Sequence, residues 1–477
     1  MSEASDLFSN VRQAIYDTFD SCADAIFNTL DSLSGRQQAQ SVAELSLESS
    51  FDREYSSLYG AIESFFVPSS PDTAVSERQQ QSLRRVECLL PALPQPTKHP
   101  FWLTGIDATP ALRPYANRLP DRGVVYCPNP APGNKPIGVG HSYSILALLP
   151  ERESRDPPWV VPISCQRIPT ENTANKVAAT QMTALLSDSN LPFGSELTVN
   201  TGDSSYSKVN YLSPVCKFSN HVEILRVARN RKFYRPATNP CTGKRGRPKW
   251  FGEPFDLKDE STWGPPDEEI EIAWTTGSGR QLKIKLQRWN GLIMHGKKGM
   301  PMHDNLFDLV RCQAVDSEGK QVFKNNLWLM VIGERRSEIT TNVAHGAYRQ
   351  RYDMEHYFRF GKNRMLLDAY QTPELAHEEN WWEIVCLAYT QLVIAAPLSN
   401  TTPRPWERYL PKWKNRTEPG PTQVQRDYGR IIQAFGTPAS PPKPRGNSPG
   451  RQAGTLPNRR LPQAVIFKNK DPPKKAA

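Results

Sequence analysis

Hydrophobic positions near the N-terminus recur with helical spacing. From Leu7 to Leu30, seven apolar side chains follow one another at steps of three or four residues. This spacing predicts an amphipathic helix. More helical pattern follows up to the Pro-rich run LLPALPQP, which ends the segment. We therefore predict an all-α N-terminal domain over residues 1–95.

The pattern changes from Phe101 onwards. Short apolar or alternating runs that are separated by Pro, Gly and Asn are typical of β-strands. Such runs occur in FWLTGID, GVVYC, SYSILALL, WVVPISC and ELTVNTGD, whereas Ala174 to Leu186 has helical spacing. Strands combined with helices predict a mixed α/β core. We place the first part of this core at residues 96–235.

The second half of the chain returns to the core after an interruption. Alternating segments such as EIEIAW and QLKIKLQRW predict a β-rich insertion over residues 236–325. The apolar run LWLMVIG then predicts a strand, followed by a long helix from about Glu338 to Leu367 and a second helix from about Pro373 to Ala396. Residues 326–400 would thus complete the core. Residues 401–477 are basic and Pro-rich, so we predict a mostly disordered tail.

Charge is distributed unevenly along the chain. The formal net charge is +10, but residues 1–95 carry six Arg against fourteen Asp and Glu, a net of −8. Residues 402–477 carry sixteen basic and four acidic residues, a net of +12. A basic surplus favours a polyanionic partner, because Lys and Arg on phosphates release counterions. The alternative interpretation is a solvated basic tail.

A second basic segment lies before the insertion. Residues 226–249 contain nine basic residues and no acid. Within them, Lys244 and Arg245 precede a Gly-Arg-Pro sequence, centred on Arg247, that resembles hooks in the minor groove of A/T-rich DNA. A general contact with the DNA backbone and a solvated loop are the alternatives.

Cysteine and apolar patterns exclude several classes of protein. The eight cysteines are scattered without a CxxC pair, which argues against a zinc site or a disulfide framework. No uninterrupted apolar run approaches the ~18 to 20 residues of a membrane span. The N-terminus lacks the layout of a secretory signal. We expect a cytoplasmic protein with reduced thiols and no membrane partner.

One stretch combines residues that suit phosphate and metal binding. Tyr348, Arg351, Glu355 and Lys362 are separated by three, four and seven residues. On a helix these positions fall within about 60° of one another. Arg and Lys can bind backbone phosphates, while the carboxylate between them can bind a divalent metal ion. Asp353 points about 200° away from Glu355, and we predict that it is a structural ion-pair partner.

Two further acids follow apolar runs. Asp107 ends FWLTGID, and Asp203 ends ELTVNTGD. At the ends of two strands their side chains can converge above a sheet. Together with Glu355, they could hold two Mg²⁺ ions about 4 Å apart, an arrangement that activates a water or a 3′-hydroxyl in phosphoryl transfer.

With these residues the chain resembles the DDE transposases of bacterial insertion sequences. It matches the Tyr-x2-Arg-x3-Glu-x6-Lys signature of their cut-and-paste branch at Tyr348, Arg351, Glu355 and Lys362. The resemblance spans roughly residues 100–396. It implies an RNase H-like core, a β-rich insertion before the Glu helix, and catalytic Asp107, Asp203 and Glu355.

The resemblance also implies substrates and partners. These are double-stranded DNA at transposon terminal inverted repeats, target DNA, a homodimer that pairs the ends, and Mg²⁺ with Mn²⁺ as substitute. Tyr348, Arg351 and Lys362 would contact phosphates near the active site. Relatives in this branch pass through DNA hairpins with a flipped base on a tryptophan, a place that Trp328 would take; a core tryptophan is the alternative.

Two other functions remain open at this point. One is an RNase H-like nuclease without strand transfer, and the other is a catalytically inactive DNA-binding regulator derived from a transposase. The chain also departs from its relatives in one respect. They often carry an N-terminal domain that grips the terminal repeats, whereas residues 1–95 here are acidic.

Overall fold

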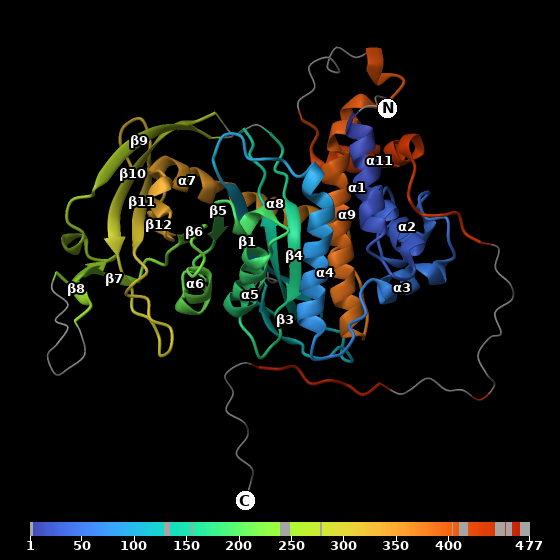
Figure 1. Cartoon of the computed structure of the whole chain (residues 1–477), viewed down its shortest axis with the longest axis horizontal. Coiled ribbons are helices and arrows are strands. Elements are labelled where there is room, and N and C mark those ends of the chain that lie inside the picture. The colour runs from blue at the N-terminus through green and yellow to red at the C-terminus, as the bar shows by residue number, and fades with distance from the viewer. Residues whose placement is uncertain are drawn as a thin grey trace, which may run out of the picture.

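The computed structural model shows a mixed α/β architecture, which confirms the predicted fold class (Figure 1). It describes residues 3–127, 134–153, 156–238, 249–276, 279–402, 404–409, 418–443, 454 and 460–467. A long sheet occupies one side and the centre of the molecule, and a group of helices occupies the other side. The helices are α1 (Glu3–Tyr16), α2 (Ala23–Ser34), α3 (Tyr55–Ser64), α4 (Ala74–Leu89), α5 (Ala174–Ser187), α6 (Val209–Val215), α7 (Thr341–Gln350), α8 (Tyr352–Arg364), α9 (Leu375–Thr401) and α11 (Pro421–Phe435).

Ten strands form the large sheet, in the order β2-β3-β1-β5-β6-β12-β11-β10-β9 with β4 also paired to β3. Strand β1 runs antiparallel to β3 and parallel to β5, and β5 runs parallel to β6. Strands β7 and β8 form a separate two-stranded sheet. The strands are β1 (Trp102–Leu112), β2 (Gly123–Tyr126), β3 (Ile137–Leu148), β4 (Val161–Arg167), β5 (Thr198–Gly202), β6 (His221–Arg226), β7 (Lys232–Pro236), β8 (Phe251–Asp256), β9 (Glu268–Thr275), β10 (Gln281–Leu292), β11 (Phe307–Val315) and β12 (Leu327–Ile332).

The strands of residues 236–325 extend the core sheet. We predicted β-strands in this segment, and β8 to β11 are found there. Strand β11 pairs with β12, and β12 pairs with β6, so β9, β10 and β11 continue the sheet beyond the core strands. Sequence alternation cannot reveal this, because it defines which face of a strand is buried but not its neighbour.

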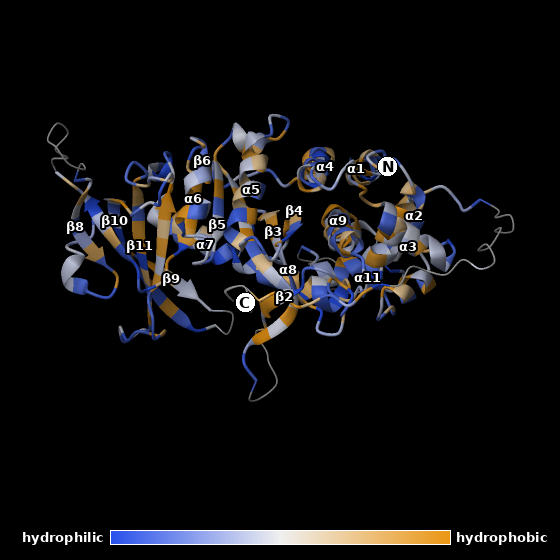
Figure 2. Ribbon diagram, turned by 90° about the horizontal axis from the view of Figure 1, so that it is seen from below, coloured by the Kyte–Doolittle hydropathy of each residue, from blue (hydrophilic) through white to orange (hydrophobic). Residues whose placement is uncertain are grey.

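Helices cover both faces of the core strands (Figure 2). Successive strand residues point to opposite faces, and two neighbours on β3 show this. Tyr143 stacks on Trp382 of α9, with ring centroids 3.9 Å apart. Ser144 donates instead to Gln181 of α5, with Oγ 2.6 Å from Oε1. Helix α9 thus covers one face and α5 the other.

Helix α9 is the centre of the helical part of the molecule. It is long and apolar enough to span a membrane, but 72% of its most apolar window is buried inside the protein. A helix that is apolar on all sides is expected to be buried. Here α1, α2, α3 and α11 pack around it and β4 lies against it. Trp381 and Trp382 are fully buried.

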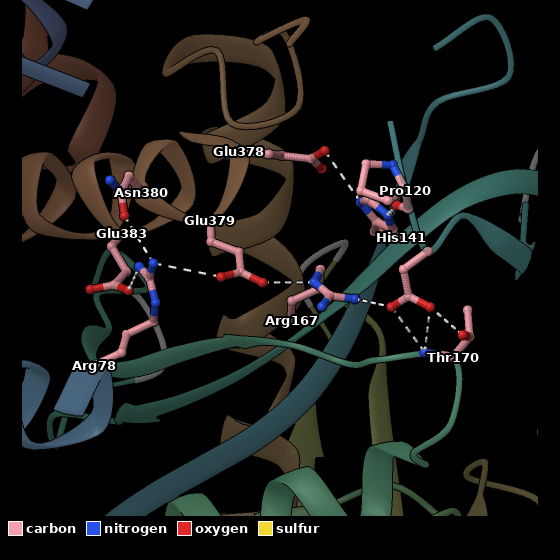
Figure 3. Close-up of polar contacts among 10 residues, drawn as sticks. Arg78, Pro120, His141, Arg167, Thr170, Glu378, Glu379, Asn380 and Glu383 are labelled. Atoms are coloured by element: carbon pink, nitrogen blue, oxygen red, sulfur yellow. Dashed lines mark hydrogen bonds and ion pairs between the residues drawn. The ribbon is translucent and has the colours of Figure 1, made fainter. Parts of the chain in front are cut away.

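Carboxylates on α9 fasten α4 and the sheet edge to it (Figure 3). Arg78 of α4 forms an ion pair with Glu383 and donates to Asn380, with Nη2 2.9 Å from Oδ1. Arg167 of β4 donates to Glu379, with Nε 2.7 Å from Oε1. These groups are largely buried, so each charge depends on its partner for stabilisation.

Two helices differ from the predicted pattern. The amphipathic spacing from Leu7 to Leu30 predicted one helix, but the chain turns between α1 and α2. Cys22 there adopts a left-handed conformation with φ 53°. The turn folds α2 back, so that both apolar faces enter one core.

The predicted mostly disordered tail contains a packed helix. Val424, Tyr428 and Ile431 of α11 are fully buried. Helix α11 has Pro421 in its first turn and ends before Gly436, whose φ is 83°, and both are common helix boundaries. Only a few apolar residues mark this helix, and its stability comes from packing on α9. Residues 410–417, 444–453, 455–459 and 468–477 of the tail lie outside the described residues.

A buried histidine gives one testable consequence of this packing. His345 of α7 is 5% exposed, and burial, together with the nearby charge of Arg349, lowers its pKa to about 4. In the unfolded chain His345 binds a proton near pH 6.5, whereas in the folded chain it stays neutral down to about pH 4. The free energy of unfolding therefore falls as the pH falls from about 6.5 to about 4.

We expect His345→Gln to remove this dependence. Between pH 7 and pH 4.5, the wild type should lose roughly 2 kcal/mol more of its free energy of unfolding than the variant. Urea unfolding at both pH values measures the difference. Equal losses in the two proteins would contradict a buried neutral imidazole.

Candidate active site

The register of β1 and β5 directs Asp107 and Asp203 toward the same end of the sheet. The two strands are parallel, and paired residues differ by 96 in number, as in Trp102 with Thr198. The pairing ends at Gly105 with Thr201, two residues before each acid, and Asp203 directly follows β5. The charge of Asp203 acts on the pKa of Asp107. Two acids that are far apart in sequence are therefore near each other, beyond the point at which the pairing of the two strands ends.

The position of Asp107 differs from the prediction in one respect. It was expected at the end of a strand, but β1 continues to Leu112. Beyond Gly105 the strand has lost its pairing with β5 and pairs with β3, where Asp107 lies opposite Ile145. The antiparallel hairpin thus extends β1 past the acid, while β5 ends one residue before Asp203.

Helix α8 adds Glu355 to the same place. A Cβ atom on Gly105 would lie 3.3 Å from Met354 Cγ, so α8 packs closely on this face of β1. Residues 105 and 107 of a strand share a face. Arg351 Nη1 lies 2.8 Å from Asp107 Oδ2, and its Nη2 lies 3.1 Å from Glu355 Oε1. One guanidinium therefore joins an acid of the sheet to an acid of the helix.

The electrostatics of Asp107 show that the three acids share one environment. The pKa of Asp107 is raised to about 6, mainly by burial and to a smaller extent by the charges of Asp203 and Glu355. The Arg351 guanidinium and the Ala108 backbone N–H, which donates from 2.8 Å, act in the opposite direction. A cation at this place is therefore favourable, because it stabilises the ionised carboxylate.

The acids suit a divalent metal ion as a set of donors. Carboxylate oxygens are the ligands that Mg²⁺ and Mn²⁺ prefer, and the guanidinium of Arg351 is a stand-in cation at two of the three acids. Within the described ranges, no group of three His, Cys, Asp or Glu side chains lies close enough to hold a metal ion. The chemistry of the three acids therefore fits a metal ion, although this structure does not hold them at metal-ligand spacing.

Two supporting residues were not predicted from the sequence. Ser205 donates from both N (2.8 Å) and Oγ (2.5 Å) to Asp203 Oδ1, which fixes that carboxylate. Its signal was the Asp-x-Ser spacing of an Asx turn. Arg152 binds the buried Asp353 through Nη2 (2.7 Å) and Nε (2.8 Å). The prediction of a structural ion pair at Asp353 is confirmed, but no local pattern identifies its partner.

The helix that carries the signature residues is not continuous. We predicted one helix from about Glu338 to Leu367, but α7 ends at Gln350 and α8 begins at Tyr352. At Arg351 the backbone hydrogen bonds span three residues: its N donates to Tyr348 O (3.2 Å), and its O accepts from Met354 N (3.0 Å). This tighter turn rotates Tyr348 relative to Glu355.

Tyr348 and Lys362 lie on either side of the acids along the two helices. The Tyr348 ring centroid is 5.7 Å from Arg351 Cζ, and the residue is 9% exposed. Lys362 Nζ donates to Pro110 O of β1 at 2.7 Å. Lys362 therefore lies near the end of β1 that follows Asp107.

Trp328 lies in an aromatic cluster of the extended sheet. It is 2% exposed, with ring centroids 5.0 Å from Trp263 and 5.8 Å from Trp289. Neither face of its indole is open to a base in this structure, so stacking would require the cluster to open. The other predicted DNA contacts, Lys244, Arg245 and Arg247, lie outside the described residues.

Comparison with known proteins identifies one family. The sequence model of the DDE superfamily endonucleases matches residues 18–291. This is more than half of the 477 residues, and it includes Asp107 and Asp203 but ends before Glu355. A search of curated proteins finds no match.

Proposed function

The chain belongs to the DDE superfamily endonucleases, and we propose that it is a transposase of the insertion-sequence type that carries the Tyr-x2-Arg-x3-Glu-x6-Lys signature. Membership implies an endonuclease or transposase that acts on DNA with divalent metal ions. The proposal adds that the enzyme joins the 3′-hydroxyl that it frees to a second DNA.

One observation carries this proposal. Arg351 joins Asp107 of β1 to Glu355 of α8, and the parallel strands β1 and β5 direct Asp107 and Asp203 toward the same end of the sheet. These are the three acids that the resemblance requires, and the family match includes two of them. The mixed sheet that positions them is compatible with the RNase H-like core that we propose.

The residues of the candidate site would have three separate roles: metal binding, support of a metal ligand and phosphate binding. Asp107, Asp203 and Glu355 would hold two Mg²⁺ ions, which supply activation of the attacking hydroxyl and neutralisation of the leaving oxygen. Ser205 holds the Asp203 carboxylate in place. Arg351, Lys362 and Tyr348 would bind phosphates on either side of the reacting group. The protein needs no covalent bond to DNA.

The partners that we propose are terminal inverted repeats and a second copy of the chain. Two ends must be held together for joint insertion, which favours a homodimer on DNA. A hairpin intermediate with a base on Trp328 belongs to the same proposal, and it requires the Trp263–Trp289–Trp328 cluster to open.

A joining assay tests the function. The purified chain is mixed with DNA that flanks its own coding region, a supercoiled target plasmid and Mg²⁺. We expect flanking strands covalently joined to the plasmid through their 3′ ends. Cleavage without joining would instead identify a nuclease, and binding without cleavage would identify an inactive regulator.

A further inference from the structure

The guanidinium of Arg351 is hydrogen-bonded to Asp107 and Glu355, two of the three candidate metal ligands. Its Nη1 lies 2.8 Å from Asp107 Oδ2 and its Nη2 lies 3.1 Å from Glu355 Oε1. The arginine side chain is 14% exposed. These charge-assisted hydrogen bonds are thus partly shielded from water, which strengthens them. The guanidinium supplies positive charge where a metal ion is expected.

A metal ion and this guanidinium compete at the two carboxylates. Mg²⁺ requires near-octahedral oxygen ligands at about 2.1 Å, whereas Arg351 directs N–H groups at one oxygen of Asp107 and one oxygen of Glu355. Two cations at one pair of carboxylates repel each other, and the repulsion is stronger away from bulk water. Arg351 therefore weakens metal binding at these two acids for as long as it stays on them.

The backbone around Arg351 allows its side chain to leave without unfolding a helix. The residue lies between α7 and α8, and its backbone N and O are bonded to Tyr348 O and Met354 N. A change of side-chain rotamer leaves both of these bonds in place. Its Nε has no hydrogen-bond partner among the described residues. The guanidinium fork also matches a phosphate group as well as it matches a carboxylate.

Starting from the proposed function, we infer that Arg351 is an exchangeable cation that couples metal binding to DNA binding. Without metal, it neutralises Asp107 and Glu355. When a DNA phosphate lies beside the site, Arg351 moves to that phosphate and leaves the acids to the metal. DNA thus draws Arg351 away from the acids that bind the metal ion. A bound metal ion in turn leaves Arg351 free to bind a DNA phosphate. By linkage, each raises the affinity for the other by the same factor.

Mn²⁺ binding in the absence of turnover tests this inference. The intact chain is titrated with Mn²⁺ by calorimetry, alone and with a saturating DNA duplex that already ends at the cleaved 3′-hydroxyl. We expect the duplex to raise the Mn²⁺ affinity of the wild type by about tenfold, within the usual range of coupling between sites. In Arg351→Met, Mn²⁺ should bind about tenfold more tightly than in the wild type without DNA, and the duplex should add less than about twofold.

Arg349→Met is the matched control. Arg349 lies two residues away and stacks on Trp274, with Cζ 4.4 Å from the ring centroid. Its replacement removes the same charge from the same neighbourhood but leaves the two acid contacts intact. This variant should keep the coupling of the wild type. Arg351→Lys serves if the Met variant does not fold: an ammonium lacks the guanidinium fork that contacts both acids at once, so its DNA-free affinity should lie between the other two.

The outcomes separate this inference from the proposed function. Equal DNA-free affinities in Arg351→Met and Arg349→Met, or equal coupling in both, would overturn the role of Arg351. Mn²⁺ binding that Glu355→Gln weakens would still support the metal site in that case. If the wild type binds no Mn²⁺ even with DNA, both the inference and the proposed metal site are wrong.

Discussion

Glu355→Gln should abolish DNA strand cleavage while DNA binding stays close to that of the wild type. The amide keeps the size of the side chain and one oxygen that can accept the hydrogen bond that Arg351 Nη2 donates to Glu355 Oε1 in the wild type. It removes the negative charge that a metal ligand supplies at this place. We expect a loss of cleavage on the order of 1000-fold or more, which corresponds to about 4 kcal/mol of activation free energy.

The measurement compares cleavage of flanking DNA in Mg²⁺ with binding of the same DNA by fluorescence anisotropy. Glu338→Gln is the matched control, because Glu338 lies just before α7, is 43% exposed and pairs locally with Arg335. This control should cleave at the wild-type rate. A Glu355→Gln enzyme that cuts within about threefold of the wild type would remove Glu355 from the active site.

The largest effect on stability is expected at Glu383, which lies between two buried arginines. Arg78 forms an ion pair with one carboxylate oxygen, and Arg85 Nη1 lies 3.1 Å from the other. Burial lowers the pKa of Arg85 to about 10, so this guanidinium is still charged at neutral pH. Glu383→Ala leaves both positive charges buried without this partner. We expect a loss of roughly 3–5 kcal/mol in the free energy of unfolding.

Urea unfolding at neutral pH measures this loss. Glu374→Ala is the control: Glu374 precedes the same helix, is 46% exposed and pairs with Arg460, so its removal should cost less than about 1 kcal/mol. A combined Arg78→Met, Arg85→Met and Glu383→Leu variant should recover much of the stability, because no charge is then buried. Comparable losses in the two single variants would show that the network does not hold α4 on α9.

Buried ion pairs account for half of the arginines in the acidic N-terminal helices. Of the six arginines in residues 1–95, Arg12, Arg78 and Arg85 are buried in ion pairs. These arginines stabilise the packing around α9 and are not available to DNA phosphates. We therefore expect the basic segments elsewhere in the chain to contribute more to DNA binding than these helices do.

Local patterns predicted much of what this chain forms. Alternation and apolar runs predicted the strands that became β1 to β5 and β12, and helical spacing predicted α5 and α9. A helix was also predicted around Arg351 and Glu355, and the structure divides it into α7 and α8. These predictions succeeded because strand and helix periods depend on which face each residue buries, and that information is local.

The sequence alone determined the mixed α/β class, the family resemblance and which three acids are candidate metal ligands. Only the tertiary structure decided what surrounds the acids. It placed Arg351 against Asp107, 244 residues away, and Arg152 against Asp353, 201 residues away. It also buried Trp328, and it joined the strands β9, β10 and β11 to the core sheet. The physical reason is that pairing between distant segments depends on strand register and helix packing, which no local period encodes.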